Sequence, residues 1–364
     1  MSERHAVLAA GGTGGHMFPA QSLAEELLRR GWRVTLASDV RGMRYAGGFP
    51  EAVARQHLDA ATMARGGLTA KLAAPVALLR GVLQARRWMK ADRPDAVIGF
   101  GGYPAAPAMA AAGSLGIARL IHEQNNVLGR ANRLFVRRVR VLACGMGVPR
   151  YAPEGVRAVE IGNPVRDTAL AVAGQAYAPP EGGPVRLLVF GGSQGASVLS
   201  DLLPPALSFL PDPLRARLHV TQQARDGEIA MLKDHYDAAD ITAIEAAPFF
   251  EDMPRRIADA HLVVARAGAS TCAELSVIGR PAVLIPLPTA TNDHQSANAE
   301  WLAAAGAALA VPQAGLTPET LGGMIGDLLG DPARLSAMAG AAKATGRPDA
   351  ANVLADLVEE AADS

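Results

Sequence analysis

Short apolar runs, each followed by a helical pattern, recur along the chain and predict a parallel α/β fold. The first run covers residues 5–10 and precedes a Gly-rich turn, Pro19 and a helical pattern over 20–30. Gly31 is placed to end that helix, and the next apolar run covers 33–37. Continuous apolar runs are typical of strands that helices cover on both faces.

The pattern continues through two halves of similar plan. In the first half, strands are predicted at 95–99, 119–122 and 139–143. A second series begins after an irregular Gly-, Ala- and Pro-rich connection over 172–184, with strands predicted at 185–190, 218–221, 241–245, 262–265 and 282–286. We therefore expect two doubly wound, Rossmann-like domains facing each other across a cleft. Their predicted extents are 1–164 and 165–340. A C-terminal helix near 348–360 could pack on either domain, and we assign 341–364 to the first.

Three Gly-rich loops follow predicted strands, at 11–16, 101–103 and 191–195. Glycine lets the backbone approach a ligand closely, and a helix N-terminus after such a loop offers free N–H groups to an anion. Each loop alone could be a structural turn, but three in two tandem domains favour a ligand site. The dinucleotide fingerprint fails because Met17 replaces its third glycine, although Asp39 could serve as its acid, so a nicotinamide dehydrogenase stays an alternative.

The composition of the chain indicates its cellular compartment and excludes some classes of partner. The 364 residues include two cysteines, too few for a disulfide framework, and the N-terminus has no signal-peptide layout, so we expect a reducing, cytosolic compartment. The longest uncharged stretch, 96–118, contains several Gly and Pro residues and does not read as a membrane span. Formal neutrality, with 35 basic and 35 acidic residues, argues against a nucleic-acid partner.

The neutral total conceals two unlike halves. Residues 1–164 hold 22 Lys and Arg against 11 Asp and Glu, a balance of +11. Residues 165–364 hold 13 against 24, a balance of −11. This asymmetry indicates different partners for the two domains.

Six motifs together resemble one family. In chain order they are GGTGGH at 11–16, GGYP at 101–104, HEQN at 122–125, GNPVR at 162–166, GGSQG at 191–195 and RAGAST at 266–271. The chain resembles the MurG family of peptidoglycan glycosyltransferases, which have the two-domain glycosyltransferase-B fold. The resemblance implies inverting transfer of N-acetylglucosamine from UDP-N-acetylglucosamine to the C4 hydroxyl of the muramoyl sugar of undecaprenyl-linked lipid I, giving lipid II. It also implies a peripheral location on the cytoplasmic face of the inner membrane, and a role in cell shape and division through the cell wall.

The donor diphosphate needs positive potential when it leaves. No Asp-x-Asp metal motif occurs, so we expect no metal or other cofactor and look to the protein itself. The helix after Gly195, the Ser193 hydroxyl and the Arg166 guanidinium are the candidates, and the resemblance also assigns Ser193 and Arg166 to the donor. An interdomain salt bridge is the alternative role for Arg166.

Glu274 follows the predicted strand 262–265 and could accept both ribose hydroxyls. The pattern Thr271-x-x-Glu274 is also a capping box, which by itself explains a Glu at this spacing. The resemblance favours the ribose role and implies further donor contacts: Ala269, Ser270, Thr271, Cys272 and Ala273 around the phosphates, Phe250 near the uracil, and Gln295 and Asn298 at sugar hydroxyls. Amides suit sugars because they both donate and accept, although a plain helix-start surface would also explain Gln295 and Asn298.

The acceptor hydroxyl needs a general base. His16 lies beside the first Gly-rich loop, and an imidazole has a suitable pKa, although a solvated or capping histidine is the alternative. Glu123 is the rival base, and we expect Asn125 to orient a sugar. The resemblance adds Thr13, Gly14 and Gly15 to the substrate site and does not choose between the two bases.

Two segments depart from the family pattern. Residues 221–225 read TQQAR where the family usually has His-Gln-[Ser/Thr]-Gly, which puts a donor contact from this loop in doubt. The loop between Pro286 and Gln295 is one residue longer than expected, which weakens the assignment of Gln295 and Asn298. A UDP-sugar 2-epimerase of the same fold, or a nucleotide-binding protein without catalysis, stays open as an alternative.

A basic, apolar segment lies in the first domain. Residues 72–83 are almost wholly apolar, and Lys71, Arg80, Arg86, Arg87 and Lys90 lie in or around them. A second basic run comprises Arg137, Arg138 and Arg140. An apolar patch ringed by cations fits an anionic membrane surface, while a core helix with a solvated basic face fits the same pattern.

Overall fold

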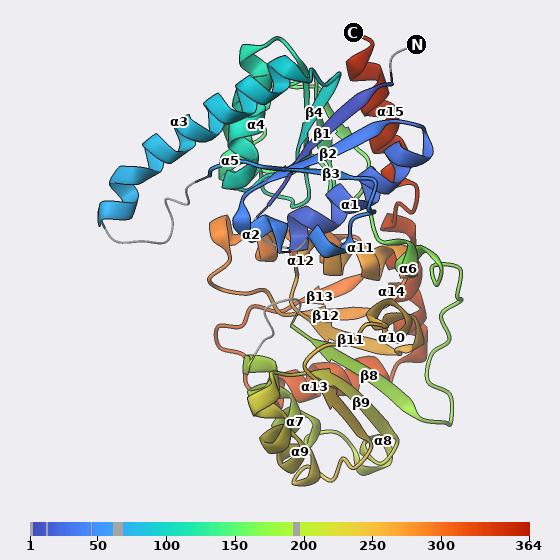
Figure 1. Ribbon diagram of the computed structural model, residues 1–364. Helices are drawn as coiled ribbons and strands as arrows, with labels where there is room; N and C mark the ends of the chain where they lie inside the picture. The colour runs from blue at the N-terminus through green and yellow to red at the C-terminus, as the bar shows by residue number, and fades with distance from the viewer. Residues whose placement is uncertain (1–2, 12–13, 45, 61–67, 192–196) are drawn as a thin grey trace. The chain divides into compact units, whose positions relative to one another are not determined.

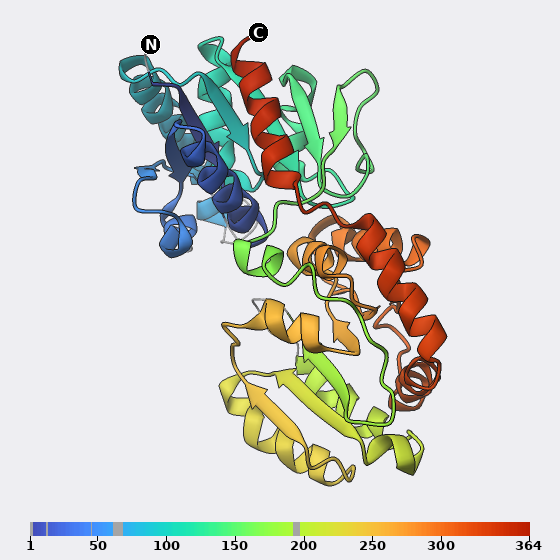
Figure 2. The same cartoon turned by 90° about the vertical axis from the view of Figure 1, so that its right-hand side faces the viewer.

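The computed structural model describes residues 3–11, 14–44, 46–60, 68–191 and 197–364, with the backbone alone for 68–74. The chain forms two compact units (Figures 1 and 2). Unit 1 comprises Met1–Arg166 with Arg347–Ser364, and unit 2 comprises Asp167–Gly346. The divisions thus fall slightly after the predicted boundaries at 164 and 340, which places Arg166 in unit 1 rather than with the donor domain.

Unit 1 is built on a parallel sheet with the strand order β3-β2-β1-β4-β5-β6-β7 among the described residues. Chain connections run outward in opposite directions from the central pair, β1 and β4, so the switch point of the sheet lies between these two strands. The strands are β1 (His5–Ala9), β2 (Arg33–Ser38), β3 (Ala54–His57), β4 (Ala96–Gly99), β5 (Ala118–Glu123), β6 (Val141–Cys144) and β7 (Ala158–Glu160).

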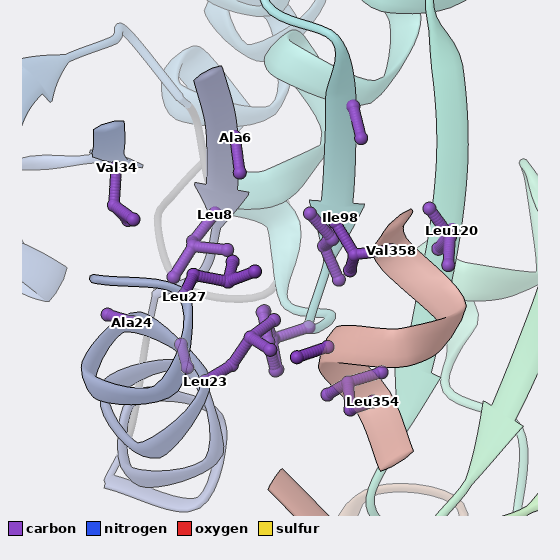
Figure 3. Close-up of a cluster of buried hydrophobic side chains, with 14 of the residues drawn as sticks. Ala6, Leu8, Leu23, Ala24, Leu27, Val34, Ile98, Leu120, Leu354 and Val358 are labelled. Carbon is purple, nitrogen blue, oxygen red and sulfur yellow. The ribbon is translucent and has the colours of Figure 1, made fainter. Parts of the chain in front are cut away.

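Helices cover both faces of this sheet. Ala6 and Leu8 of β1 pack toward α1 and α15 (Figure 3), while Val7 and Ala9 pack toward α3 and α4. This alternation explains why β1 is buried at every position and apolar from Ala6 to Ala9. The helices of unit 1 are α1 (Gly14–Arg29), α2 (Val40–Met43), α3 (Leu68–Ala91), α4 (Ala106–Ser114), α5 (Arg130–Arg133) and α15 (Ala350–Ala362), with short 3-10 turns at Ala46–Gly48, Tyr103–Ala105 and Val136–Arg138.

The C-terminal helix α15 packs on unit 1, which decides between the two domains that its sequence left open. Leu354 and Val358 are fully buried in the cluster that also contains Leu8 (Figure 3). The Trp32 indole donates to Glu359 at 3.2 Å, and the Arg30 guanidinium donates to the same carboxylate at 3.0 Å. Apolar burial and charged hydrogen bonds therefore hold the end of the chain against its beginning.

Unit 2 repeats the plan with a parallel sheet in the order β10-β9-β8-β11-β12-β13, again counting described residues. Its switch point lies between β8 and β11. The strands are β8 (Val185–Phe190), β9 (Leu218–Gln223), β10 (Ile244–Ala247), β11 (Leu262–Ala265), β12 (Ala282–Leu284) and β13 (Ala308–Ala310). The helices are α6 (Asp167–Leu170), α7 (Ser197–Leu207), α8 (Asp212–Arg215), α9 (Ile229–Asp237), α10 (Met253–Asp259), α11 (Ala269–Ile278), α12 (His294–Ala304), α13 (Pro318–Leu329) and α14 (Pro332–Thr345), with 3-10 turns at Asp226–Glu228 and Thr291–Asp293.

The expected class, two α/β domains with parallel sheets, is confirmed, and the errors are local. The pattern missed β3, β7 and β13, which all lie at sheet edges. β3 and β7 lack a continuous apolar run, and β13 is an apolar strand of only three residues. Helix α1 begins at Gly14, ahead of the predicted start after Pro19. Met17, Pro19 and Ala20 are buried against the sheet, so tertiary packing extends this helix across a proline.

Candidate functional site

The loops at the switch point of unit 1 pack so closely that they require glycine. A Cβ on Gly11 would lie 2.6 Å from the Cβ of Pro104, and one on Gly102 would lie 2.7 Å from the carbonyl oxygen of Gly11. Gly102 also has φ +75°, which side chains rarely adopt. The glycines after β1 and β4 therefore bring two loops together at the edge where open α/β sheets bind ligands.

Glu123, at the end of β5, is a buried carboxylate whose oxygens accept four hydrogen bonds. One oxygen accepts from the backbone N–H and the side-chain amide of Asn125, both at 3.2 Å. The other accepts from the Gly129 N–H and the Asn132 amide, both at 2.8 Å. Four donors match the lone pairs of an ionised carboxylate, so Glu123 organises the loop after β5 and holds Asn125 in place.

His16, in the first turn of α1, faces the same loop. Its Nδ1 lies 3.1 Å from Oε1 of Gln124. Gly101 leaves room for the ring, because a Cβ there would lie 3.2 Å from the His16 Cε1. The structure thus brings His16 to the HEQN segment. The ring is half-buried and has Gln124 as a hydrogen-bond partner, so it is not a freely solvated histidine.

His122 lies behind Gln124 and is fully buried. Its Nε2 lies 3.3 Å from the carbonyl oxygen of Gly162, and its ring packs against Phe100. Desolvation by burial lowers the pKa of His122 to about 4, although the hydrogen bond to Gly162 opposes that shift. The imidazole is therefore neutral at pH 7.

The buried His122 makes stability depend on pH. Its pKa is lowered in the fold relative to the ordinary 6.5, so the unfolded chain takes up a proton first as pH falls. We expect the free energy of unfolding of unit 1 to fall by roughly 3 kcal/mol from this group between about pH 6.5 and pH 4. Urea unfolding at several pH values measures the slope. His122→Phe should flatten it and the exposed-site control His235→Phe should not; equal slopes would contradict the assignment.

In unit 2, helix α11 begins directly after the switch-point strand β11. Gly268 is its N-cap, and Ala269, Ser270 and Thr271 form its first turn, whose N–H groups point toward the carboxyl end of the sheet. The capping-box explanation of Glu274 is therefore wrong, because Thr271 is inside the helix and not at its N-cap. Glu274 lies in the second turn and is buried, and Cys272 is buried in the core, so only its backbone can face a ligand.

Two amides of α12 hold the neighbouring loops. Asn298 donates to the carbonyl oxygen of Ala267 at 3.0 Å, and Oε1 of Gln295 accepts from the N–H of Leu287 at 3.0 Å. Arg266, which sequence reasoning did not single out by itself, donates to the carbonyl oxygens of Ile285 and Pro286, both at 3.0 Å. These bonds place the loops after β11 and β12 beside the start of α11.

Other predicted donor residues are placed individually. Phe250 is buried, with the Arg256 guanidinium 4.1 Å from its ring centroid, while its neighbour Phe249 is 68% exposed. The Arg166 guanidinium lies 5.0 Å from the ring of Phe18 in unit 1. Thr13 and Ser193 lie outside the described residues, whereas Gly14, Gly15 and Ala273 lie in α1 and α11.

Two other sequence hypotheses now have structural explanations. Asp39 caps the short helix α2 by accepting from the Gly42 N–H at 2.8 Å, which accounts for the acid considered for a dinucleotide site. Gln222, in the departing segment 221–225, is fully buried and accepts from the Tyr236 hydroxyl. In the described part of the chain, no cluster of three or more His, Cys, Asp or Glu could hold a metal ion.

Comparison with known proteins agrees with this arrangement. The model of the glycosyltransferase family 28 N-terminal domain matches residues 6–143, and that of the C-terminal domain matches 186–354. A relative from Mesorhizobium japonicum, 50% identical over 97% of this chain and 94% of its own, is named UDP-N-acetylglucosamine–N-acetylmuramyl-(pentapeptide) pyrophosphoryl-undecaprenol N-acetylglucosamine transferase. A Rhodospirillum centenum protein of the same name is 48% identical over 100% of this chain and 96% of its own.

The crystal structure of MurG from Acinetobacter baumannii superposes with a TM-score of 0.81 at 33% identity, covering 98% of this chain and 99% of that one. The chain belongs to the MurG branch of glycosyltransferase family 28. A putative UDP-N-acetylglucosamine 2-epimerase from Listeria monocytogenes has a TM-score of 0.71 at 14% identity, which shows a shared fold alone.

Sequence reasoning missed three residues that build the site: Gln124, Asn132 and Arg266. Gln124 stands inside the HEQN motif, so its position was a signal, but the motif does not reveal that its amide meets two histidines. Asn132 donates to the Glu123 carboxylate, and Arg266 donates to the backbone oxygen of Ile285. Their roles follow from tertiary contacts.

Proposed function

We propose that this chain transfers N-acetylglucosamine from UDP-N-acetylglucosamine to the C4 hydroxyl of the muramoyl sugar of undecaprenyl-linked lipid I, with inversion. The observation that carries the proposal is the sequence identity of 48–50%, over 97–100% of this chain, to relatives named for this transfer. Close-packed loops lie at the switch point of unit 1, and helix α11 begins after a switch-point strand of unit 2. Such positions are where open α/β sheets bind ligands, so the two units offer a site for each of two substrates.

His16 is the general base in this proposal. It takes the proton from the acceptor hydroxyl while that oxygen bonds to the anomeric carbon and UDP departs from the opposite side. Glu123 is a poorer base because its oxygens already accept four hydrogen bonds. It instead fixes Asn125, which orients the acceptor, while Thr13, Gly14 and Gly15 border the same site.

The donor side rests on α11. Its first-turn N–H groups at Ala269, Ser270 and Thr271 suit the negative charge that develops on the diphosphate. Ser193 adds a hydroxyl, and Glu274 accepts the ribose hydroxyls. Arg166, the last residue of the first segment of unit 1, is the cation that the resemblance assigns to the diphosphate. In this proposal Phe250 borders the uracil and Gln295 contacts sugar hydroxyls. Asn298, which is fully buried, supports the site by holding the Ala267 carbonyl, and Cys272 and Ala273 continue the helix behind its first turn.

Acceptor dependence tests the function. Purified protein with UDP-N-acetylglucosamine should release UDP only when a lipid I analogue is present, and the product should carry the added sugar with inverted configuration. A 2-epimerase would convert the donor sugar without acceptor. UDP release or epimerisation in the absence of acceptor would contradict the transferase.

We infer further that α3 provides a peripheral contact with an anionic membrane on the cytoplasmic face. Val76, Leu79 and Leu83 are 53%, 60% and 56% exposed, while Ala85 and Met89 of the same helix are fully buried. A purely core helix would not expose three large apolar side chains in two turns. Arg80 and Arg87, also exposed, supply positive charge next to them. No helix in the described ranges is both long and apolar enough to cross a bilayer.

The apolar face of α3 should matter for membrane binding. Leu79→Ser combined with Leu83→Ser should weaken binding to vesicles containing anionic lipid about tenfold or more, since burial of each leucine contributes roughly 1.5–3 kcal/mol at most. Vesicle co-sedimentation measures the change. The control is Phe209→Ser with Met231→Ser, which removes exposed apolar side chains from unit 2. Equal binding of all three proteins would overturn the α3 contact.

A further inference from the structure

A chain of hydrogen bonds runs from a buried carbonyl to the proposed base. It links the Gly162 carbonyl oxygen to His122 Nε2 at 3.3 Å, His122 Nδ1 to Gln124 Nε2 at 3.1 Å, and Gln124 Oε1 to His16 Nδ1 at 3.1 Å. Gln124 Nε2 also lies 3.1 Å from the backbone oxygen of His122. His122 and Gln124 are almost completely buried, so the chain is enclosed up to His16.

Two backbone carbonyls determine which atom is the donor in each of these hydrogen bonds. A carbonyl oxygen only accepts, so His122 Nε2, which faces Gly162, must carry the hydrogen. Because His122 is neutral, its Nδ1 then holds a lone pair and must accept. The Gln124 group that faces both this nitrogen and the His122 carbonyl oxygen must therefore be the NH2, whose two hydrogens match two acceptors.

The amide oxygen of Gln124 consequently faces His16, and it only accepts. His16 Nδ1 must then be the protonated nitrogen of the neutral ring, and Nε2 must carry the lone pair. We propose that Gln124, oriented by His122 and the Gly162 carbonyl, is a positioning residue that holds His16 in the Nδ1–H tautomer and so leaves Nε2 to take the acceptor proton. This inference rests on the proposed function for its catalytic meaning, but the tautomer itself is a property of the free protein.

The surrounding backbone keeps the chain rigid. The Asn163 amide donates to the carbonyl oxygen of Gln124 at 2.9 Å, which ties the residues after Gly162 to the HEQN segment. Gly162 has φ +85°, and a Cβ there would lie 2.4 Å from the Cβ of Arg347, so its backbone is held closely. The carbonyl that starts the chain of hydrogen bonds therefore has a fixed position. A neutral histidine side chain in water favours the Nε2–H tautomer, so this chain holds His16 in the less favoured Nδ1–H tautomer.

Nitrogen NMR of the full-length protein tests the tautomer. In protein labelled with ¹⁵N-histidine, with His16 assigned by its loss in His16→Ala, we expect Nδ1–H in the wild type. Gln124→Met, which removes the acceptor, should shift His16 toward Nε2–H. Gln124→Glu retains an oxygen acceptor and should keep Nδ1–H. The matched control Gln222→Met removes an equally buried amide in unit 2 and should leave His16 unchanged.

Kinetics give the second measurement. Gln124→Met should lower kcat about 10- to 100-fold with an unchanged KM for UDP-N-acetylglucosamine, since a wrong tautomer impairs proton transfer and not donor binding. Nε2–H at His16 in the wild type would overturn the inference whether or not any variant folds, and so would an unchanged tautomer in Gln124→Met. If the tautomer depends on Gln124 while His16→Ala turns over normally, the positioning chain stands and only the base assignment fails.

Discussion

We expect His16→Ala to lower kcat by roughly 10²- to 10⁴-fold, the contribution of a positioned general base. Affinity for UDP should stay within about twofold, because the proposed base acts on the acceptor hydroxyl and is not among the proposed donor contacts. Steady-state kinetics with a lipid I analogue and calorimetric titration with UDP measure the two quantities separately.

The control for this variant is His235→Ala, which removes an exposed histidine from α9. It should leave kcat unchanged. Near-normal turnover of His16→Ala would move the base role to Glu123, despite the four hydrogen bonds that its carboxylate accepts. In that case Glu123→Gln, which keeps the shape and removes the basic carboxylate, should become the more damaging change.

We expect Glu274→Ala to raise the dissociation constant for UDP by about 10- to 100-fold, because hydrogen bonds to a charged group contribute roughly 1.5–3 kcal/mol. Helix α11 begins at Ala269, so Glu274 has no capping role. We therefore expect the free energy of unfolding to change far less than the free energy of UDP binding. Titration calorimetry and thermal unfolding of the same preparations provide both values.

Glu319→Ala is the control for removing a negative charge from unit 2, since this glutamate is exposed and lies in the first turn of another helix, α13. Its UDP affinity should equal that of the wild type. If Glu274→Ala binds UDP normally and instead melts much earlier, the carboxylate supports the fold of unit 2 and the ribose assignment is wrong.

The uneven charge of the two halves also acquires a physical meaning. The basic first half contains the exposed apolar face of α3 and the proposed acceptor residues, while the acidic half contains α11. Local positive potential for a diphosphate can come from helix N–H groups even where the net charge is negative. Overall neutrality therefore excludes only a uniformly basic protein.

The sequence determined the fold class and the position of the central strands. Strands β8 and β11 coincide with their predicted ranges, because strands buried on both faces are continuous apolar runs. Edge strands such as β3 escape this pattern, since at most one of their faces is covered. The motifs likewise identified the Gly-rich loops, because close backbone approach admits only one residue type.

Only the tertiary structure decided how the polar residues act. It showed that Glu274 is not a helix cap, that Glu123 is occupied by four donors, and that α15 belongs with unit 1. It also joined His16 to Gln124, which are far apart in the chain. A hydrogen bond forms only when a donor and an acceptor point toward each other at short distance. When folding brings together two residues that are far apart in the chain, no spacing in the sequence reveals that they are partners.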